Sequence, residues 1–205
     1  TGPLQFDNFY EEGFAMAKED FYSKFAIEKS RPIIVFGTIT PKYFRYNVAV
    51  LAMLKDLIQT SQIKGNPKVL VRIHPQVVKD PVHGDNLDNY LALANGNNIF
   101  SFSIPEIDEW ASIQVPKETD YKDLISILTY ADICIASAST LIFDSFACDT
   151  RFIGIGFDGN EKVPRHKSVR RMFEFEHYKN VYKLGAFSIP ESKEELVLFI
   201  YAYDE

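Results

Sequence analysis

Six short apolar runs recur along this chain of 205 residues, and stretches with helical spacing separate them. Their apolar positions are nearly continuous, which is typical of strands that are covered on both faces of a sheet. The pattern therefore predicts strands at 31–37, 68–74, 98–103, 131–136, 151–156 and, with a weaker pattern, 180–184.

The stretches between these runs predict helices. In 47–59, apolar residues recur at the spacing of one helical face. Ser192 followed by Glu195 forms a capping-box pattern that opens a last helix. The other predicted helices are 6–25, 85–94, 123–130 and 141–147. This alternation predicts a doubly wound α/β fold, with a mostly parallel, six-stranded, Rossmann-like sheet and helices on both faces.

Composition and length bound the possibilities further. No repeat or flexible linker divides the chain, so we expect one domain at 31–205 after a helical lead-in at 1–30. Lys and Arg number 22 and Asp and Glu 28, and this net charge of −6 argues against nucleic-acid binding. No apolar run approaches the roughly 20 residues that span a bilayer, and no signal-peptide pattern occurs. We expect a cytoplasmic protein, with peripheral contact at the inner membrane face as a further option, and no metal site.

Residues that follow the strands are the site candidates, because ligands of such sheets bind beyond the carboxyl ends of the strands. Gly37 and Thr38 close the first strand, and Ser103 ends the third. Gly37 stands outside any dinucleotide fingerprint or P-loop, which argues against nicotinamide or flavin dehydrogenases and P-loop NTPases. A single glycine still permits close approach of a ligand to the backbone.

The segment Ser137-Ala138-Ser139-Thr140 ends the fourth strand and begins a helix. Free N–H groups and the positive end of the helix dipole favour a phosphate there, and the hydroxyl groups add donors. Simple helix capping is the alternative interpretation. Asp144 follows one turn later, where its carboxylate could accept hydrogen bonds from a ribose diol or remain a solvated acid on the helix surface.

His74 and a basic cluster complete the candidates. His74 precedes Pro75 at a strand end, and it could donate to a phosphoryl oxygen or act as a general acid on a leaving group. A purely structural histidine is the alternative. Arg170 and Arg171 belong to a basic cluster that could contact an anionic acceptor, a membrane surface or a donor phosphate. Here the alternative is a solvated basic helix face.

The segment 123–159 reads DLISILTYADICIASASTLIFDSFACDTRFIGIGFDG and resembles the C-terminal, donor-binding half of GT-B glycosyltransferases. The most similar branch contains CDP-glycerol glycerophosphotransferases and bacterial capsule-polymerising transferases. These enzymes carry a His-Pro motif after one strand and a Ser-Ser or Ser-Thr pair at a later helix start. His74-Pro75 and Ser139-Thr140 match both motifs in the same order.

The resemblance implies a UDP- or CDP-linked donor as substrate, with no separate cofactor, and a cell-surface polysaccharide or glycolipid as product. It implies that His74 contacts the donor phosphate and assists departure of the nucleotide. Ser139 and Thr140 would hold the phosphates, and Asp144 would meet the ribose. It further implies an N-terminal acceptor domain outside these 205 residues, so we expect the chain alone to be inactive.

Two other interpretations remain open. Where CDP-glycerol enzymes usually have Thr-Asp-Tyr-Ser-Ser, this chain has Ala136-Ser-Ala-Ser-Thr140, so a glycerophosphate donor is not specifically implied. UDP-N-acetylglucosamine epimerases share the fold and comparable phosphate-binding loops, which makes an epimerase domain one alternative. A non-catalytic nucleotide-binding or scaffolding module that retains the fold is the other.

Overall fold

Five parallel strands form the centre of the computed structural model, which describes residues 4–79, 86–106 and 117–201. Their order is β3-β2-β1-β4-β5, and every neighbouring pair is parallel. The order reverses between β1 and β4, which is where ligands bind in open α/β sheets. The first five predicted strands are confirmed, and their bounds are Ile33–Gly37 (β1), Lys68–Arg72 (β2), Phe100–Ser103 (β3), Ile133–Ala136 (β4) and Arg151–Gly154 (β5).

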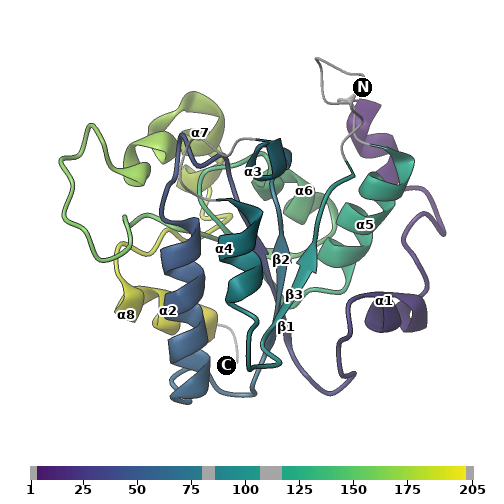
Figure 1. Cartoon of the computed structure of the whole chain (residues 1–205). Helices are drawn as coiled ribbons and strands as arrows, with labels where there is room; N and C mark the ends of the chain where they lie inside the picture. The colour runs from purple at the N-terminus through teal and green to yellow at the C-terminus, as the bar shows by residue number, and fades with distance from the viewer. Residues whose placement is uncertain (1–3, 80–85, 107–116, 202–205) are drawn as a thin grey trace.

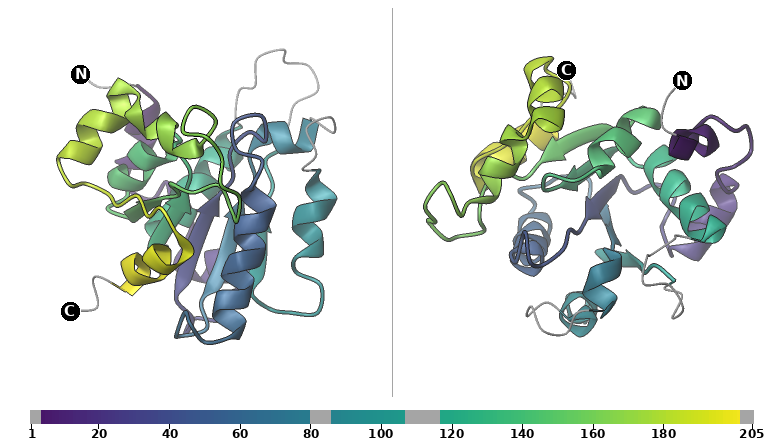
Figure 2. Two further views of the ribbon diagram at one scale, coloured as in Figure 1. Left: turned by 90° about the vertical axis from the view of Figure 1, so that its left-hand side faces the viewer. Right: turned by 90° about the horizontal axis from the view of Figure 1, so that it is seen from above.

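Helices cover both faces of the sheet, which confirms the doubly wound arrangement (Figures 1 and 2). Successive side chains of β1 point to opposite faces. Ile34 and Phe36 pack with α2 (Asn47–Gln59), α4 (Leu87–Ala92) and α8 (Lys193–Tyr201). Ile33 and Val35 pack in a second core with α1 (Lys18–Lys24), α5 (Glu118–Thr129), α6 (Leu141–Ala147) and α7 (Glu176–Lys183).

The sixth predicted strand is wrong, because 180–184 falls on α7 and its end, and the sheet has five strands. Tyr178 and Val181 contact the second core three residues apart, as on one helical face, and the two residues between them are exposed. The edge of β5 is flanked instead by a later stretch. The N–H of Gly154 donates to the carbonyl of Ser188 at 2.8 Å, but no further strand forms.

The prediction of one continuous N-terminal helix at 6–25 is also wrong. It consists of a 3₁₀ helix, η1 (Leu4–Phe9), and the separate helix α1. Between them lies Gly13, whose φ of +80° belongs to the left-handed region that glycine adopts without strain. Phe21 of α1 is fully buried in the second core, so this lead-in segment packs directly on the domain.

The remaining helices agree with the sequence to different degrees. Those predicted at 47–59 and 141–147 have these bounds, and the one predicted at 123–130 begins earlier, at Glu118. The one at 85–94 corresponds to α4, with residue 85 outside the described residues. At α8, Ser192 Oγ accepts a hydrogen bond from the Glu195 N–H at 3.1 Å, as predicted. Two short helices, α3 (Pro75–Lys79) and the 3₁₀ helix η3 (Val169–Glu174), were not predicted.

The carboxyl ends of the strands meet at the edge that is uppermost in Figure 1, where α3 and η1 also lie. The loop after β1 and the turn from β4 into α6 complete this edge. Among the residues described, no helix is both long and apolar enough to cross a membrane.

Candidate functional site

A cavity of about 290 Å³ opens at the carboxyl edge of the sheet. Its walls come from the ends of β1 and β2, from α5 and α6, and from Phe9 of η1. Among the predicted site residues, those that line it are Gly37, Thr38, His74, Ser139, Thr140 and Asp144. The structure thus gathers residues from three separate parts of the sequence into one wall.

His74 is held in place by the ends of two neighbouring strands. The backbone N–H of His74 donates to Thr38 Oγ1 at 2.7 Å, and the N–H of Thr38 donates to the carbonyl of Arg72 at 3.0 Å. The N–H of Gln76 donates to His74 Nδ1 at 3.1 Å, so the proton of the neutral ring belongs on Nε2. Burial, and secondly the charge of Arg72, lower the pKa of His74 below its usual 6.5. His74 therefore offers the cavity a neutral Nε2–H donor at neutral pH.

The turn from β4 into α6 carries the serine and threonine candidates. Ser139 Oγ accepts a hydrogen bond from the Leu141 N–H at 3.2 Å, a capping contact. Thr140 precedes the helix with helical dihedral angles and makes no side-chain capping bond. Ser137 is 1% exposed and lies outside the cavity wall, and its Oγ has no hydrogen-bond partner in the described part of the chain.

Asp144 contributes a carboxylate to the wall one turn into α6. Burial raises the pKa of this carboxyl group from its usual 3.8 to about 6. No hydrogen bond or ion pair to its side chain occurs within residues 4–79, 86–106 and 117–201. Asp144 is half-buried, and partial desolvation without a partner makes its ionised form costly, so its carboxylate is an acceptor without a described hydrogen-bond donor.

An ion pair between Arg72 and Asp120, which the sequence analysis did not predict, also lines the cavity. Arg72 Nη2 and Asp120 Oδ2 lie 2.5 Å apart, and their side chains are only 12% and 10% exposed. Arg72 Nη1 also donates to Ser103 Oγ at 2.8 Å. Arg72 directly follows the apolar run 69–71 and stands two residues before His74, and a charge at the end of a buried run was the signal that could have identified it.

The structure gives a reason for the glycine at position 37 that differs from the expected approach of a ligand to the backbone. A Cβ atom at Gly37 would lie 2.3 Å from Leu141 Cδ2 and 3.3 Å from Ala136 Cβ. The glycine therefore lets the start of α6 approach the end of β1 closely, which brings the two motifs together. At this position, the close contact is between α6 and the end of β1.

The remaining candidates lie outside the cavity. Ser103 is 3% exposed and reaches the site only through Arg72. Arg170 Nη1 donates to the carbonyl of Ile189 at 3.0 Å, and its Nη2 pairs with Glu191 at 3.0 Å. Arg171 is exposed and lines a separate hollow. No group of three His, Cys, Asp or Glu among the described residues is placed to hold a metal ion.

The raised pKa of Asp144 makes the stability of the protein depend on pH. The folded state binds the Asp144 proton more tightly than the unfolded state, so this group destabilises the fold as pH rises from about 4 to about 6. We expect Asp144→Asn to match the wild type at pH 4 and to exceed its unfolding free energy by up to about 3 kcal/mol at pH 7. Urea denaturation at both pH values measures this, and a difference independent of pH would contradict it.

Solved structures that superpose with the chain include three epimerases, one of them putative. No family model and no curated sequence matches the chain. The UDP-GlcNAc 2-epimerase of Neisseria meningitidis, bound to UDP-GlcNAc, superposes with a TM-score of 0.55 at 7% identity over 90% of this chain. A putative UDP-N-acetylglucosamine 2-epimerase of Listeria monocytogenes gives 0.55 at 7% over 97%. The Methanocaldococcus jannaschii UDP-GlcNAc 2-epimerase, in complex with UDP-GlcNAc and UDP, gives 0.52 at 11% over 97%.

These likenesses concern the fold. The matched region is 40%, 41% and 44% of the respective structures, so the chain spans about two fifths of their length. At 7% to 11% identity, the shared feature is the arrangement of strands and helices. The chain therefore has a GT-B-like, Rossmann-type fold.

Proposed function

We propose that this chain is the donor-binding domain of a nucleotide-sugar-dependent glycosyltransferase, or of a related glycerophosphotransferase, that builds a cell-surface polysaccharide or glycolipid. The observation that carries the proposal is the cavity at the strand-order switch, where His74 and the Ser139-Thr140 turn face one space. Its 290 Å³ lies near the lower end of the roughly 300–1,000 Å³ of small-molecule sites. A diphosphate with part of its nucleoside fits this size.

Hydrogen-bond donors would hold the diphosphate in this cavity. His74 supplies Nε2–H, and the hydroxyl groups of Ser139 and Thr140 add donors beside the start of α6. Arg72 brings a guanidinium group whose charge Asp120 already balances. The site would therefore recognise phosphate by directed donors more than by net positive charge, which agrees with the overall charge of −6.

Asp144 is proposed to contact the ribose of the donor. A carboxylate beside a diphosphate would be repelled, whereas a ribose diol offers two O–H donors to an acceptor that has no protein partner. A ribose at Asp144 would supply hydrogen-bond donors to this half-buried acid and lower its pKa again, because hydrogen bonds to the ionised form favour that form.

His74 is proposed as the catalytic residue. In glycosyl transfer, the acceptor oxygen forms a bond to the anomeric carbon, the bond between that carbon and the β-phosphate oxygen breaks, and the nucleoside diphosphate leaves with the electron pair. Donation from His74 Nε2–H to the phosphate stabilises the charge that develops on it. The acceptor hydroxyl, and the base that takes its proton, belong in this proposal to an acceptor domain outside the chain.

The proposal predicts that His74→Ala weakens binding of UDP by about tenfold or more, since a hydrogen bond to a charged group contributes about 1.5–3 kcal/mol. Binding of uridine, which has no phosphate, should change less than about twofold. Isothermal titration calorimetry with UDP, CDP and GDP measures both. Equal losses for UDP and uridine would remove His74 from the phosphate site, and a folded wild type that binds none of the three diphosphates would refute the proposal.

A double variant separates the role of Arg72 in binding from its role in folding. Arg72→Met alone should cost about 3–5 kcal/mol of stability, because it leaves Asp120 buried without its cation. Combining it with Asp120→Leu should recover most of this loss in urea denaturation while UDP affinity stays about tenfold reduced. A double variant that binds UDP as tightly as the wild type would show that Arg72 does not contact the phosphates.

An epimerase domain is the second candidate, because the three structures compared above are UDP-GlcNAc 2-epimerases, one of them putative. The natural protein that contains this chain should be incubated with UDP-GlcNAc without an acceptor and followed by proton NMR. Our proposal predicts no isomer and a release of UDP that requires an acceptor. An isomer formed without acceptor would favour the epimerase, and bound nucleotide with neither product would favour a non-catalytic module.

A further inference from the structure

A second hollow, of about 570 Å³, lies apart from the cavity and shares no lining residue with it. Two parts of the chain that are distant in sequence form it: the loop after β1, and the stretch that runs from residue 166 through η3 into the first turn of α7. Its polar and aromatic lining includes Lys42, Tyr43, Lys167, Arg171, Phe175 and His177, and no Asp or Glu lines it. We refer to it as the basic hollow.

The cations of the basic hollow are unpaired, although the chain has more acidic than basic residues. Lys42, Lys167 and Arg171 are exposed and have no carboxylate within 4.0 Å among the described residues. Arginines close by in the structure behave differently. Arg165 pairs with Glu174, and Arg170 pairs with Glu191. The available acids thus neutralise the cations around the hollow and leave those inside it free.

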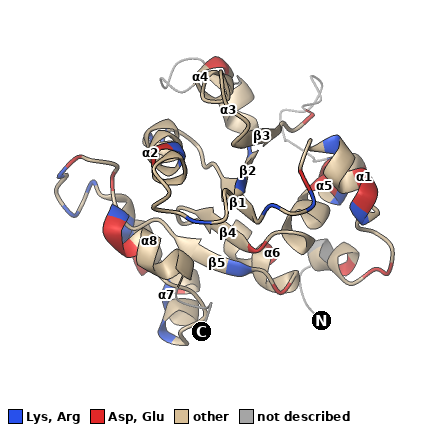
Figure 3. Cartoon of the chain, turned by 90° about the horizontal axis from the view of Figure 1, so that it is seen from below, with Lys and Arg blue, Asp and Glu red and all other residues tan. Residues whose placement is uncertain are grey.

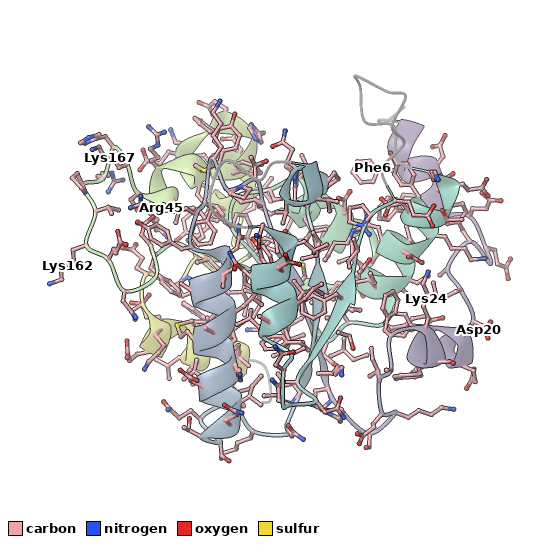
Figure 4. All side chains as sticks on the ribbon, in the orientation of Figure 1. Phe6, Asp20, Lys24, Arg45, Lys162 and Lys167 are labelled. Atoms are coloured by element: carbon pink, nitrogen blue, oxygen red, sulfur yellow. The ribbon has the colours of Figure 1, made fainter. Side chains whose placement is uncertain are left out.

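Figures 3 and 4 show where these charged segments lie. Figure 3 shows acidic as well as basic segments along the loop that precedes η3. Figure 4 places Lys167 on the side of the molecule where Arg45 and Lys162 also lie, on segments that approach one another beside α7. Arg45 is held by Glu161 at 3.1 Å, whereas Lys167 lines the hollow without such a partner.

Aromatic faces accompany these cations. Phe175 is 52% exposed and Tyr43 is 61% exposed, so both rings are accessible to a ligand in the hollow. Phe175 stacks on His177 at a centroid distance of 6.2 Å, and His177 contacts Tyr178 at 4.0 Å. Rigid exposed rings around unpaired cations are the composition of a site that binds a ring-bearing anion.

We propose that the basic hollow binds the phosphate group of a phosphorylated saccharide, with the sugar ring against Phe175 and Tyr43. Arg171 and Lys167 supply charge-assisted hydrogen bonds to the phosphate oxygens. The concave shape and the exposed rings favour a discrete sugar phosphate over a flat anionic membrane. The proposal rests on the hollow alone and stands independently of the function proposed for the cavity.

Proton–nitrogen correlation NMR of the whole chain, titrated with α-glucose 1-phosphate, tests this proposal. We expect saturating shifts of the amide signals of Ser168, Arg171 and His177. The double variant Lys167→Gln/Arg171→Gln should weaken this binding at least about tenfold. Arg165→Gln, a basic residue of the same loop that does not line the hollow, should change it less than about twofold. Absence of saturating shifts, or equal losses in the two variants, would overturn the proposal.

Two further experiments, one with a variant of Phe175 and one with lipid vesicles, test the nature of the ligand. Phe175→Ala should weaken binding of glucose 1-phosphate and leave that of inorganic pyrophosphate unchanged, because only the sugar meets the ring. Equal weakening of the binding of both ligands would overturn the assignment of the sugar to Phe175.

A vesicle titration tests the membrane alternative. If the same amide signals respond to vesicles of phosphatidylcholine and phosphatidylglycerol but not to glucose 1-phosphate, the hollow is a membrane contact and the proposal is wrong. Signals around His74 report the cavity separately, so failure at one site is distinguishable from failure at the other.

Discussion

The hydrogen bonds of Thr38 hold the ends of β1 and β2 in one register, and the candidate site depends on them. The N–H of Thr38 donates to Arg72, and its Oγ1 accepts the N–H of His74. These bonds extend the parallel ladder beyond its last regular pair, Gly37 with Arg72, so that His74 leaves the sheet at a defined point. Gly37 then lets α6 approach the end of β1, which brings the Ser139-Thr140 turn to the same edge.

Desolvation governs the electrostatics of this edge. Burial keeps His74 neutral and the Asp144 carboxyl group partly protonated near pH 6, while Arg72 and Asp120 neutralise each other. Five ionisable side chains line the cavity, and near neutral pH the Asp144 carboxylate carries a charge that no described cation within 4.0 Å balances. Among the described residues, His74 Nε2–H and the hydroxyl groups of Ser139 and Thr140 are available donors, and the Asp144 carboxylate is an available acceptor. A ligand with an anionic end and a hydroxyl-rich end complements both, which is the pattern of a nucleoside diphosphate.

The electrostatics of the basic hollow differ from those of the cavity. Its cations are exposed and unpaired, so binding there would depend on net charge and respond strongly to salt. The two hollows therefore suit anions of different kinds, one by directed hydrogen bonds from a largely half-buried wall and one by an open cluster of cations and rings.

Sequence periodicity predicted five strands and the helices at 47–59 and 141–147, because these elements bury regular apolar patterns. It failed at 180–184, where a run of five residues is too short to distinguish a strand from one helical face. The strand-end rule found His74, Ser139, Thr140 and Asp144 in one wall. It missed the pair of Arg72 and Asp120, because the partners are 48 residues apart and only the packing of α5 on the sheet edge joins them.

A crystal structure of this chain with UDP tests the central claim most directly. The account predicts a phosphate oxygen within hydrogen-bond distance of His74 Nε2, a second phosphate contact at Ser139 or Thr140, and the ribose at Asp144. UDP bound with its diphosphate away from His74, or bound only in the basic hollow, would contradict the account.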